Sequence, residues 1–347
     1  MALREHRGRI LAAVEIDVVQ NELLVAAIQL ETKDGDVAAN IELAERMASE
    51  AFDKGAAVVG LPEFYTGRIA PSDEAFNIVL PAANKAIDMM VRLARKYGGR
   101  IGGSMLAADN GEIYNRYVLA EPDGKLHRHD KDLPTMWENA FYIGGADDGV
   151  WETGIGTLGA AVCWELVRHQ TIRRMQGRVQ FAMTGTHWWT MPENWPITEP
   201  LLRAIGQYNR YMSEQAPVEF ARRLGAPVLQ ASHCGPLSGK YLVLPGTDLG
   251  FEMRSHFVGA SQIVDAQGKV LASRNTMEGP GIVMAKITPA VTAPVIRSDP
   301  NRFWIPHHAL FIKAYWYHHN FVNKSAYRRY GRRLGLEAAA RNTSVGE

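Results

Sequence analysis

Cysteine, excess charge and long apolar runs are all scarce in this sequence. Only two cysteines occur among the 347 residues, Cys163 and Cys234, which excludes a disulfide scaffold and predicts a reducing, cytoplasmic setting. The net charge of +1 argues against nucleic acid or an anionic membrane as a partner. No uncharged apolar stretch approaches the roughly 20 residues that span a bilayer, and Glu5, Glu15 and Asp17 interrupt any N-terminal targeting pattern.

The sequence does contain an alternation of strand-like and helical segments, which predicts an α/β fold. No repeat or linker interrupts residues 23–290, so we expect one domain there. Residues 1–22 then form an N-terminal extension, and the aromatic, basic residues 291–347 form a tail that packs on the surface or contacts another subunit. The expected strands are 23–30, 56–61, 101–106, 113–120, 156–162, 179–184, 228–231, 261–264, 269–272 and 282–287, and the expected helices are 36–52, 82–97, 165–175 and 198–224.

Three reactive residue types each follow the end of an apparent strand. Glu63 follows the run 56–62, Lys131 follows 124–130, and Cys163 follows the small and apolar residues 156–162. An unperturbed cysteine has a pKa of about 8.5 and needs a neighbouring base or cation before it can attack carbon. The carboxylate is able to accept the thiol proton, and the ammonium is able to stabilise a developing negative charge. Each residue alone is ordinary, but the three contexts together indicate one active site.

Two other patterns in the chain resemble a cofactor site and a metal site, but the residues around them argue against both. Gly154, Gly156 and Gly159 fit a dinucleotide-binding pattern, but they run into a strand and not into a helix, which argues against that site. Histidine pairs such as His127 and His129 lack partners at metal-ligand spacing. We therefore predict no organic cofactor and no metal.

Three ordered segments resemble the signatures of one enzyme family. Leu61-Pro-Glu63, Lys131-Asp-Leu-Pro-Thr-Met-Trp-Glu138 and Val162-Cys-Trp-Glu165 resemble those of the nitrilase (carbon–nitrogen hydrolase) superfamily, and the resemblance extends over about residues 23–290. The second and third segments favour the nitrilase branch. Leu166-Val-Arg-His169 stands where nitrilases commonly place a Pro-Leu pair, so nitrile and amide substrates both stay open.

The resemblance implies a four-layer α-β-β-α sandwich with a Glu-Lys-Cys triad at the strand ends. Glu63 would be the general base and Cys163 the nucleophile. Lys131 would stabilise the tetrahedral intermediate with the backbone N–H of Trp164, and Glu138 would orient the site. Such enzymes need no metal or organic cofactor, and by analogy a homo-oligomer is expected.

The aromatic residues near these segments are candidates for the substrate pocket. We predict that it is lined by Trp164, Tyr65, Trp137, His187 and Trp188, although core packing explains any single one of them equally well.

The combined patterns predict a cysteine-dependent hydrolase of non-peptide carbon–nitrogen bonds. It would convert a small nitrile or amide to the carboxylic acid, releasing ammonia or an amine through a thioester intermediate. Two alternatives stay open at this point. An amine instead of water would intercept the thioester in an acyltransferase, and a non-catalytic binding protein would keep the fold without turnover.

Overall fold

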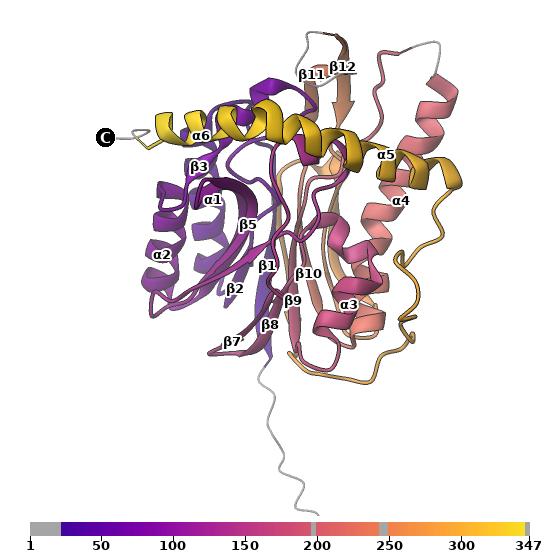
Figure 1. The fold of residues 1–347 in the computed structure, drawn as a ribbon. Helices are drawn as coiled ribbons and strands as arrows, with labels where there is room; N and C mark the ends of the chain where they lie inside the picture. Colours follow the sequence, from indigo (N-terminus) through magenta and orange to yellow (C-terminus); the bar gives the residue numbers. More distant parts are fainter. Residues whose placement is uncertain (1–21, 196–198, 243–248, 344–347) are drawn as a thin grey trace, which may run out of the picture.

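Two layers of strands lie between two layers of helices in the computed structural model, which describes residues 22–195, 199–242 and 249–343 (Figure 1). Helices α1 (Val37–Asp53) and α2 (Lys85–Tyr97) cover one outer face, and α3 (His169–Met175) and α4 (Glu199–Leu224) cover the opposite one. The predicted four-layer α-β-β-α sandwich is confirmed. Most of the expected extension, residues 1–21, lies outside the described residues.

The strands of the sandwich form one hydrogen-bonded network. Its path is β6-β5-β4-β2-β1-β10-β9-β8-β7, with β15 on β1, β13 on β10, β14 on β13 and β3 on β4, while β11 and β12 form a separate two-stranded ribbon. The strands are β1 (Leu23–Leu30), β2 (Val58–Gly60), β3 (Leu80–Pro81), β4 (Arg100–Asp109), β5 (Glu112–Ala120), β6 (Leu126–Asp130), β7 (Val150–Thr153), β8 (Gly156–Ala160), β9 (Phe181–Thr186), β10 (Val228–His233), β11 (Pro236–Leu242), β12 (Gly250–His256), β13 (Gly259–Val264), β14 (Val270–Asn275) and β15 (Gly281–Ile287).

The two strand layers are joined at the carboxyl ends of β1 and β10. These parallel strands pair only at Gln29 with Ser232 and at Leu30 with His233. Along the rest of its length β1 pairs with β15 and β2, while β10 pairs with β9 and β13. Because β1, β2, β9 and β10 run parallel, their carboxyl ends meet at one edge. Loops that follow parallel strands at such an edge commonly carry the functional residues of α/β proteins.

Local sequence signals account for the helix boundaries. The side chain of Asp36 accepts a hydrogen bond from Ala39 N at 3.0 Å and caps α1. Asn84 caps α2 by accepting from Ile87 N, and Gly98 ends that helix in the left-handed conformation with φ 65°. The predicted helix over 165–175 is wrong in its first turn, because a 3₁₀ turn at Cys163–Val167 precedes α3.

The predicted C-terminal tail contains two helices that were not expected from the sequence. Helices α5 (Leu310–Ala326) and α6 (Arg332–Arg341), joined by a π-helical turn, cross the edge where the carboxyl ends meet (Figure 1). The Tyr327 hydroxyl accepts from Ile113 N at 3.0 Å and donates to Glu112 at 2.7 Å, which fastens the tail to β5.

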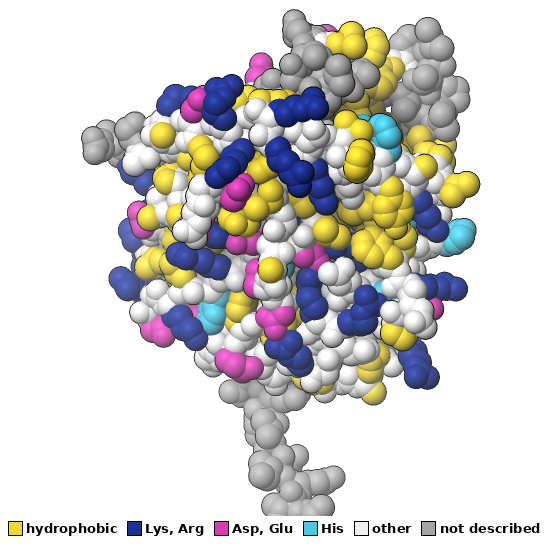
Figure 2. Space-filling model, in the orientation of Figure 1, with side chains coloured by type: hydrophobic (Ala, Val, Ile, Leu, Met, Phe, Trp, Pro, Cys, Tyr) yellow, Lys and Arg dark blue, Asp and Glu magenta, His cyan; other side chains and the backbone are white. Residues whose placement is uncertain are grey.

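Apolar side chains are also exposed where α5 crosses the molecule (Figure 2). Leu310 is 83% exposed and Phe321 is 82% exposed. The tail packs on its own chain through contacts such as those of Tyr327 and leaves these apolar side chains exposed. The predicted subunit contact stays a prediction. Within the described residues, no helix is long and apolar enough to cross a membrane.

Gly185 in β9 places the backbone of the two strand layers in direct contact, and we predict that Gly185→Ala is destabilising. A Cβ there would lie 2.3 Å from Glu63 N and 2.6 Å from the carbonyl carbon of Pro62. Backbone has to move, at a cost of about 1–3 kcal/mol. Denaturant unfolding measures this loss. Gly206→Ala in α4 is the control, because its nearest neighbours would lie 3.5 and 3.7 Å away. Equal stability of the two variants would contradict the prediction.

Candidate active site

The first predicted residue, Glu63, is a fully buried carboxylate beyond the end of β2. Its Oε1 accepts from Lys131 Nζ at 2.9 Å and from Asn115 Nδ2 at 2.8 Å. Its Oε2 is buried and has no hydrogen-bond partner, and the Cys163 thiol interacts with the same carboxylate and acts to lower its pKa. The carboxylate is thus fixed through one oxygen, while the other is available to the thiol.

Lys131 joins Glu63 to the second glutamate of the site. It follows β6, is fully buried, and donates to Glu138 Oε2 at 2.9 Å as well as to Glu63. Glu138 lies in the 3₁₀ turn Met136–Ala140 and also accepts from Thr135 N at 2.9 Å and from the Tyr142 hydroxyl. One fully buried ammonium therefore sits between two carboxylates.

Cys163 occupies a sharp turn after β8. Its φ of 53° is in the left-handed region, which is costly for a residue with a Cβ, and its side chain is 2% exposed. The indole N–H of Trp188 donates to the Cys163 sulfur, and the backbone N–H of His187 interacts with the same sulfur and acts to lower the pKa of the thiol. Both donors come from the end of β9, so two strand ends together fix the sulfur.

Burial controls the ionisation of these groups. It raises the pKa of Glu63 to about 7, and the ammonium of Lys131 only partly offsets it. Burial and the negative charge of Glu63 raise the pKa of the Cys163 thiol well above its usual range. Although burial opposes its charge, Lys131 has a pKa held well above the usual value by Glu138 and Glu63. At neutral pH the site thus holds the charged ammonium of Lys131, the protonated thiol of Cys163, and the carboxyl group of Glu63, whose pKa lies close to that pH.

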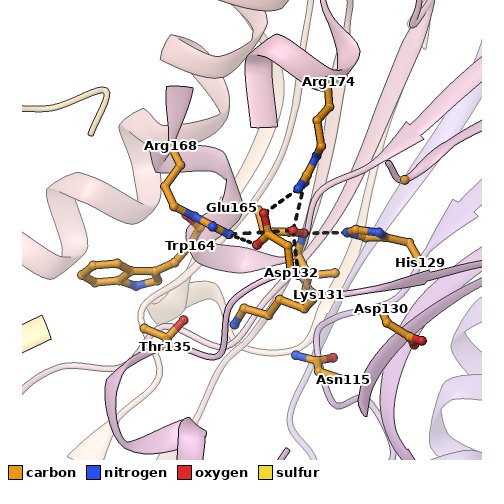
Figure 3. Close-up of polar contacts among 12 residues, drawn as sticks. Asn115, His129, Asp130, Lys131, Asp132, Thr135, Trp164, Glu165, Arg168 and Arg174 are labelled. Carbon is orange, nitrogen blue, oxygen red and sulfur yellow. Dashed lines mark hydrogen bonds and ion pairs between the residues drawn. The ribbon is translucent and has the colours of Figure 1, made fainter. Parts of the chain in front are cut away.

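A further buried carboxylate, Glu165, connects the Lys131 segment to the Cys163 segment (Figure 3). Its Oε2 accepts from Val162 N at 2.6 Å, and its Oε1 accepts from Asp132 N at 3.1 Å. These are the residues immediately before Cys163 and immediately after Lys131. One side chain therefore sets the distance between the two segments.

Charges of opposite sign surround Glu165 and offset the cost of its burial. Figure 3 shows Arg168, Arg174 and His129 directed at it. Although burial opposes ionisation, His129 and the two arginines hold the pKa of Glu165 well below its usual range. Burial also disfavours charge on His129, but Glu165 and Asp147 raise its pKa to about 10. The cluster has three cations and three carboxylates: His129, Arg168 and Arg174, with Asp132, Asp147 and Glu165.

A cavity of about 410 Å³ adjoins Cys163 and Glu138. Its walls come from the 3₁₀ turn before Ala140, the segment after β9, helix α4, strand β11 and helix α5. The lining residues are Thr135, Met136, Trp137, Glu138, Cys163, Trp164, His187, Trp188, Trp189, Met191, Pro192, Trp195, Ile205, Tyr208, Asn209, Tyr241, Phe311, Ile312 and Tyr315.

Four of the five residues predicted to bind substrate line this cavity, namely Trp164, Trp137, His187 and Trp188. Tyr65 does not line the cavity, contrary to the prediction that it does. It is fully buried in the core, and its hydroxyl donates to Ala86 O at 3.3 Å. The left-handed backbone of Phe64, with φ 53°, turns the chain between Glu63 and Tyr65. The side chain therefore packs toward α2 and not toward the pocket.

Sequence reasoning missed several residues that hold the site together. Asn115 donates to Glu63, Tyr142 donates to Glu138, and Glu165 links the two catalytic segments. An amide in the largely apolar strand 113–120 is a signal for Asn115, because a buried amide needs hydrogen-bond partners. Nothing local marked the contribution of α5, which reaches the pocket from far along the chain. Among the described residues, no group of three or more His, Cys, Asp or Glu side chains is arranged to hold a metal ion.

Comparison with known proteins agrees with this fold and site. Residues 24–297 match the model of the carbon-nitrogen hydrolase family, and the chain therefore belongs to that family of enzymes. Its structural neighbours lie in the nitrilase superfamily. A superfamily protein from Xanthomonas campestris, with an arsenic adduct in its active site, superimposes with a TM-score of 0.59 at 19% identity, covering 77% of this chain and 91% of that one.

Two sequence relatives carry different activities in their names. N-carbamoylputrescine amidase from Arabidopsis thaliana is 29% identical over 44% of this chain and 54% of that protein. A bifunctional nitrilase/nitrile hydratase from Lupinus angustifolius is 30% identical over 40% of this chain and 46% of that protein. The chain spans about half the length of the curated relatives it matches, so these names do not distinguish amide from nitrile.

The cluster around Glu165 predicts a loss of stability at alkaline pH. The pKa of His129 is about 10 in the folded protein, against about 6.5 in an unfolded chain. Its contribution is fully present below about pH 6.5 and is lost as pH rises toward 10. The free energy of unfolding should fall across this window, and His129→Gln should flatten the fall. His256→Gln, at an exposed histidine, should leave the slope unchanged. Identical slopes in all three proteins would refute the assignment.

Proposed function

We propose that the protein hydrolyses a nitrile or an amide to the carboxylic acid through a thioester on Cys163. The observation that carries this proposal is the buried Glu63–Lys131–Glu138 network beside the sulfur. The family assignment and the amidase and nitrilase names of the relatives support the same reaction class.

Glu63 is the proposed general base. Because Cys163 rests as a thiol, proton removal has to accompany attack on the substrate carbon. A base with a pKa near the working pH does this best, and that of Glu63 is about 7. With an amide, the new S–C bond gives a tetrahedral oxyanion. Its collapse expels the amine, which takes the proton from Glu63, and leaves the thioester.

Lys131 and the backbone N–H of Trp164 are the proposed stabilisers of the oxyanion. The ammonium is fully buried, and its charge acts in a medium of low dielectric constant. Glu138 accepts a hydrogen bond from the same ammonium and so orients it. Removing a comparable donor typically costs about 10²–10³ in rate.

Water completes the reaction. Glu63, again a carboxylate, takes a proton from water, and the oxygen attacks the thioester to release the acid and restore the thiol. A nitrile enters one step earlier. Thiol addition gives a thioimidate, and addition of one water with loss of ammonia gives the same thioester.

Ammonia release from matched nitriles and amides tests the proposal. N-carbamoylputrescine belongs in the panel because a relative carries its name. Release from either class supports carbon–nitrogen hydrolysis and identifies the preferred bond. A folded protein with an intact Cys163 that releases nothing from any member of a broad panel would refute it.

Cys163→Ala should abolish turnover without loss of the fold, because the side chain is small and alanine fits the turn. Mass spectrometry of the wild type with a slow substrate should show an acyl adduct on the peptide that contains Cys163. Cys234→Ala is the matched control, since this second buried cysteine lies after β10 and outside the cavity lining. Retention of more than a few per cent of activity by Cys163→Ala would exclude the residue as nucleophile.

Substitution of Glu63 and substitution of Glu138 should impair different steps of the reaction. Glu63→Gln cannot accept a proton, so both adduct formation and hydrolysis should collapse. Glu138→Gln should still form some adduct while turning over slowly. Rapid-quench measurement of the adduct separates the two roles, and the reverse order would mean that Glu138 is the base.

In the wild type, kcat/KM should fall about tenfold per pH unit below about pH 7, as Glu63 becomes protonated.

A further inference from the structure

The cavity beside Cys163 is walled largely by aromatic rings. Six of them are Trp188, Trp189, Trp195, Tyr208, Tyr241 and Tyr315. They come from the segment after β9, from α4, from β11 and from α5, so the ring walls surround the space from several directions. Indole and phenol faces favour other ring faces and edges, and they contribute large apolar contact areas.

Five of these six rings have polar atoms that are already hydrogen-bonded within the protein. The hydroxyls of Tyr241 and Tyr315 bond each other across the junction of β11 and α5. The Tyr208 hydroxyl bonds His308 Nδ1 at 2.8 Å, and the Trp195 N–H donates to a backbone carbonyl of β12 at 2.9 Å. What these residues offer to a ligand is therefore apolar surface.

Charge is almost absent from the cavity lining. Among the described lining residues, Glu138 is the one acidic side chain and none is lysine or arginine. His187 is neutral because burial and His233 hold its pKa well below the usual value. Glu138 already accepts from Lys131 and from two further donors. A charged acyl group would lose its hydration here without gaining a partner, which is strongly unfavourable.

The size of the cavity argues against a very small acyl group. A volume of about 410 Å³ lies within the range of roughly 300–1,000 Å³ that drug-sized ligands fill. An acetyl group bound at Cys163 would leave most of the aromatic wall uncovered and would gain little from burial of apolar surface.

We infer, resting on the proposed function, that the substrate is a nitrile or amide with a large, uncharged and apolar acyl group. An arylacetyl group represents this class. Its electrophilic carbon lies at Cys163, and its ring packs among the indole and phenol faces. The catalytic network determines the reaction, and the aromatic cavity determines which acyl groups reach it.

Four matched acyl groups test the inference, each supplied as nitrile and amide. The amides are phenylacetamide, acetamide, the anionic glutaramate and the cationic δ-aminovaleramide. Burial of one phenyl ring should raise kcat/KM by about 10²-fold over the acetyl compound. The charged compounds should be slower than the phenyl compound by at least as much. Equal or faster hydrolysis of an acetyl or charged substrate would overturn the inference.

A charge placed in the wall should shift the preference. Ile312→Arg puts a guanidinium on α5 at a lining position, so the ratio of glutaramate to phenylacetamide hydrolysis should rise by about 10²-fold. Leu310→Arg is the matched control, because this residue lies on the same helix, is 83% exposed and is outside the lining. An unchanged ratio in Ile312→Arg, or an equal shift in Leu310→Arg, would contradict the assignment of this wall.

Binding to Cys163→Ala separates this inference from the proposed reaction. Calorimetry should show tighter binding of phenylacetamide than of the other three amides, and Ile312→Arg in the same background should weaken it. If the wild type hydrolyses nothing but this binding order holds, the proposed function fails and the apolar site stands. If the four amides bind equally, or the charged ones bind best, the apolar site is wrong whether or not the enzyme turns over.

Discussion

The geometry of the whole site depends on one buried carboxylate, Glu165. It accepts from the backbone N–H groups of Val162 and Asp132, and so it ties the thiol-bearing turn to the ammonium-bearing segment. A lone charge at such depth would be prohibitively expensive. The two arginines and the imidazolium around it offset the cost of its burial. Removal of any one of these charges would leave the others poorly compensated. The 3₁₀ turn at Cys163–Val167, in place of the expected helix, accompanies this same bond to Val162.

Backbone strain gathers at the same place. Phe64, Met136 and Cys163 all have φ of 53°, and each is a catalytic candidate or lies within two residues of one. Such conformations cost about 1–3 kcal/mol each and persist only where the surroundings over-determine them. The contact of Gly185 with the Glu63 segment and the bonds of Glu165 provide that constraint. The site is therefore held in shape by the layers around it.

Sequence alone brought the reactive residues together because they share a simple geometric rule. Glu63, Lys131 and Cys163 each follow a strand, and the strand ends meet at one edge. Tyr65 could not be placed in this way, since the left-handed Phe64 breaks the continuity that the prediction assumed. The α5 helix escaped as well. It is held by ring stacking between distant residues, such as Trp316 on Trp164 at 5.4 Å, and such contacts leave no periodic trace.

Helix α5 supplies a part of the cavity wall that lies outside the region matched to the family. The family match ends at residue 297, whereas the α5 wall begins at Phe311. Phe311, Ile312 and Tyr315 therefore line the cavity from outside the matched region, whereas the proposed catalytic residues and the rest of the lining lie inside it. A change in the C-terminal segment would reshape the α5 side of the cavity without altering the proposed catalytic residues. Similarity over the matched region therefore indicates the class of reaction, and it does not determine the shape of the α5 side of the cavity.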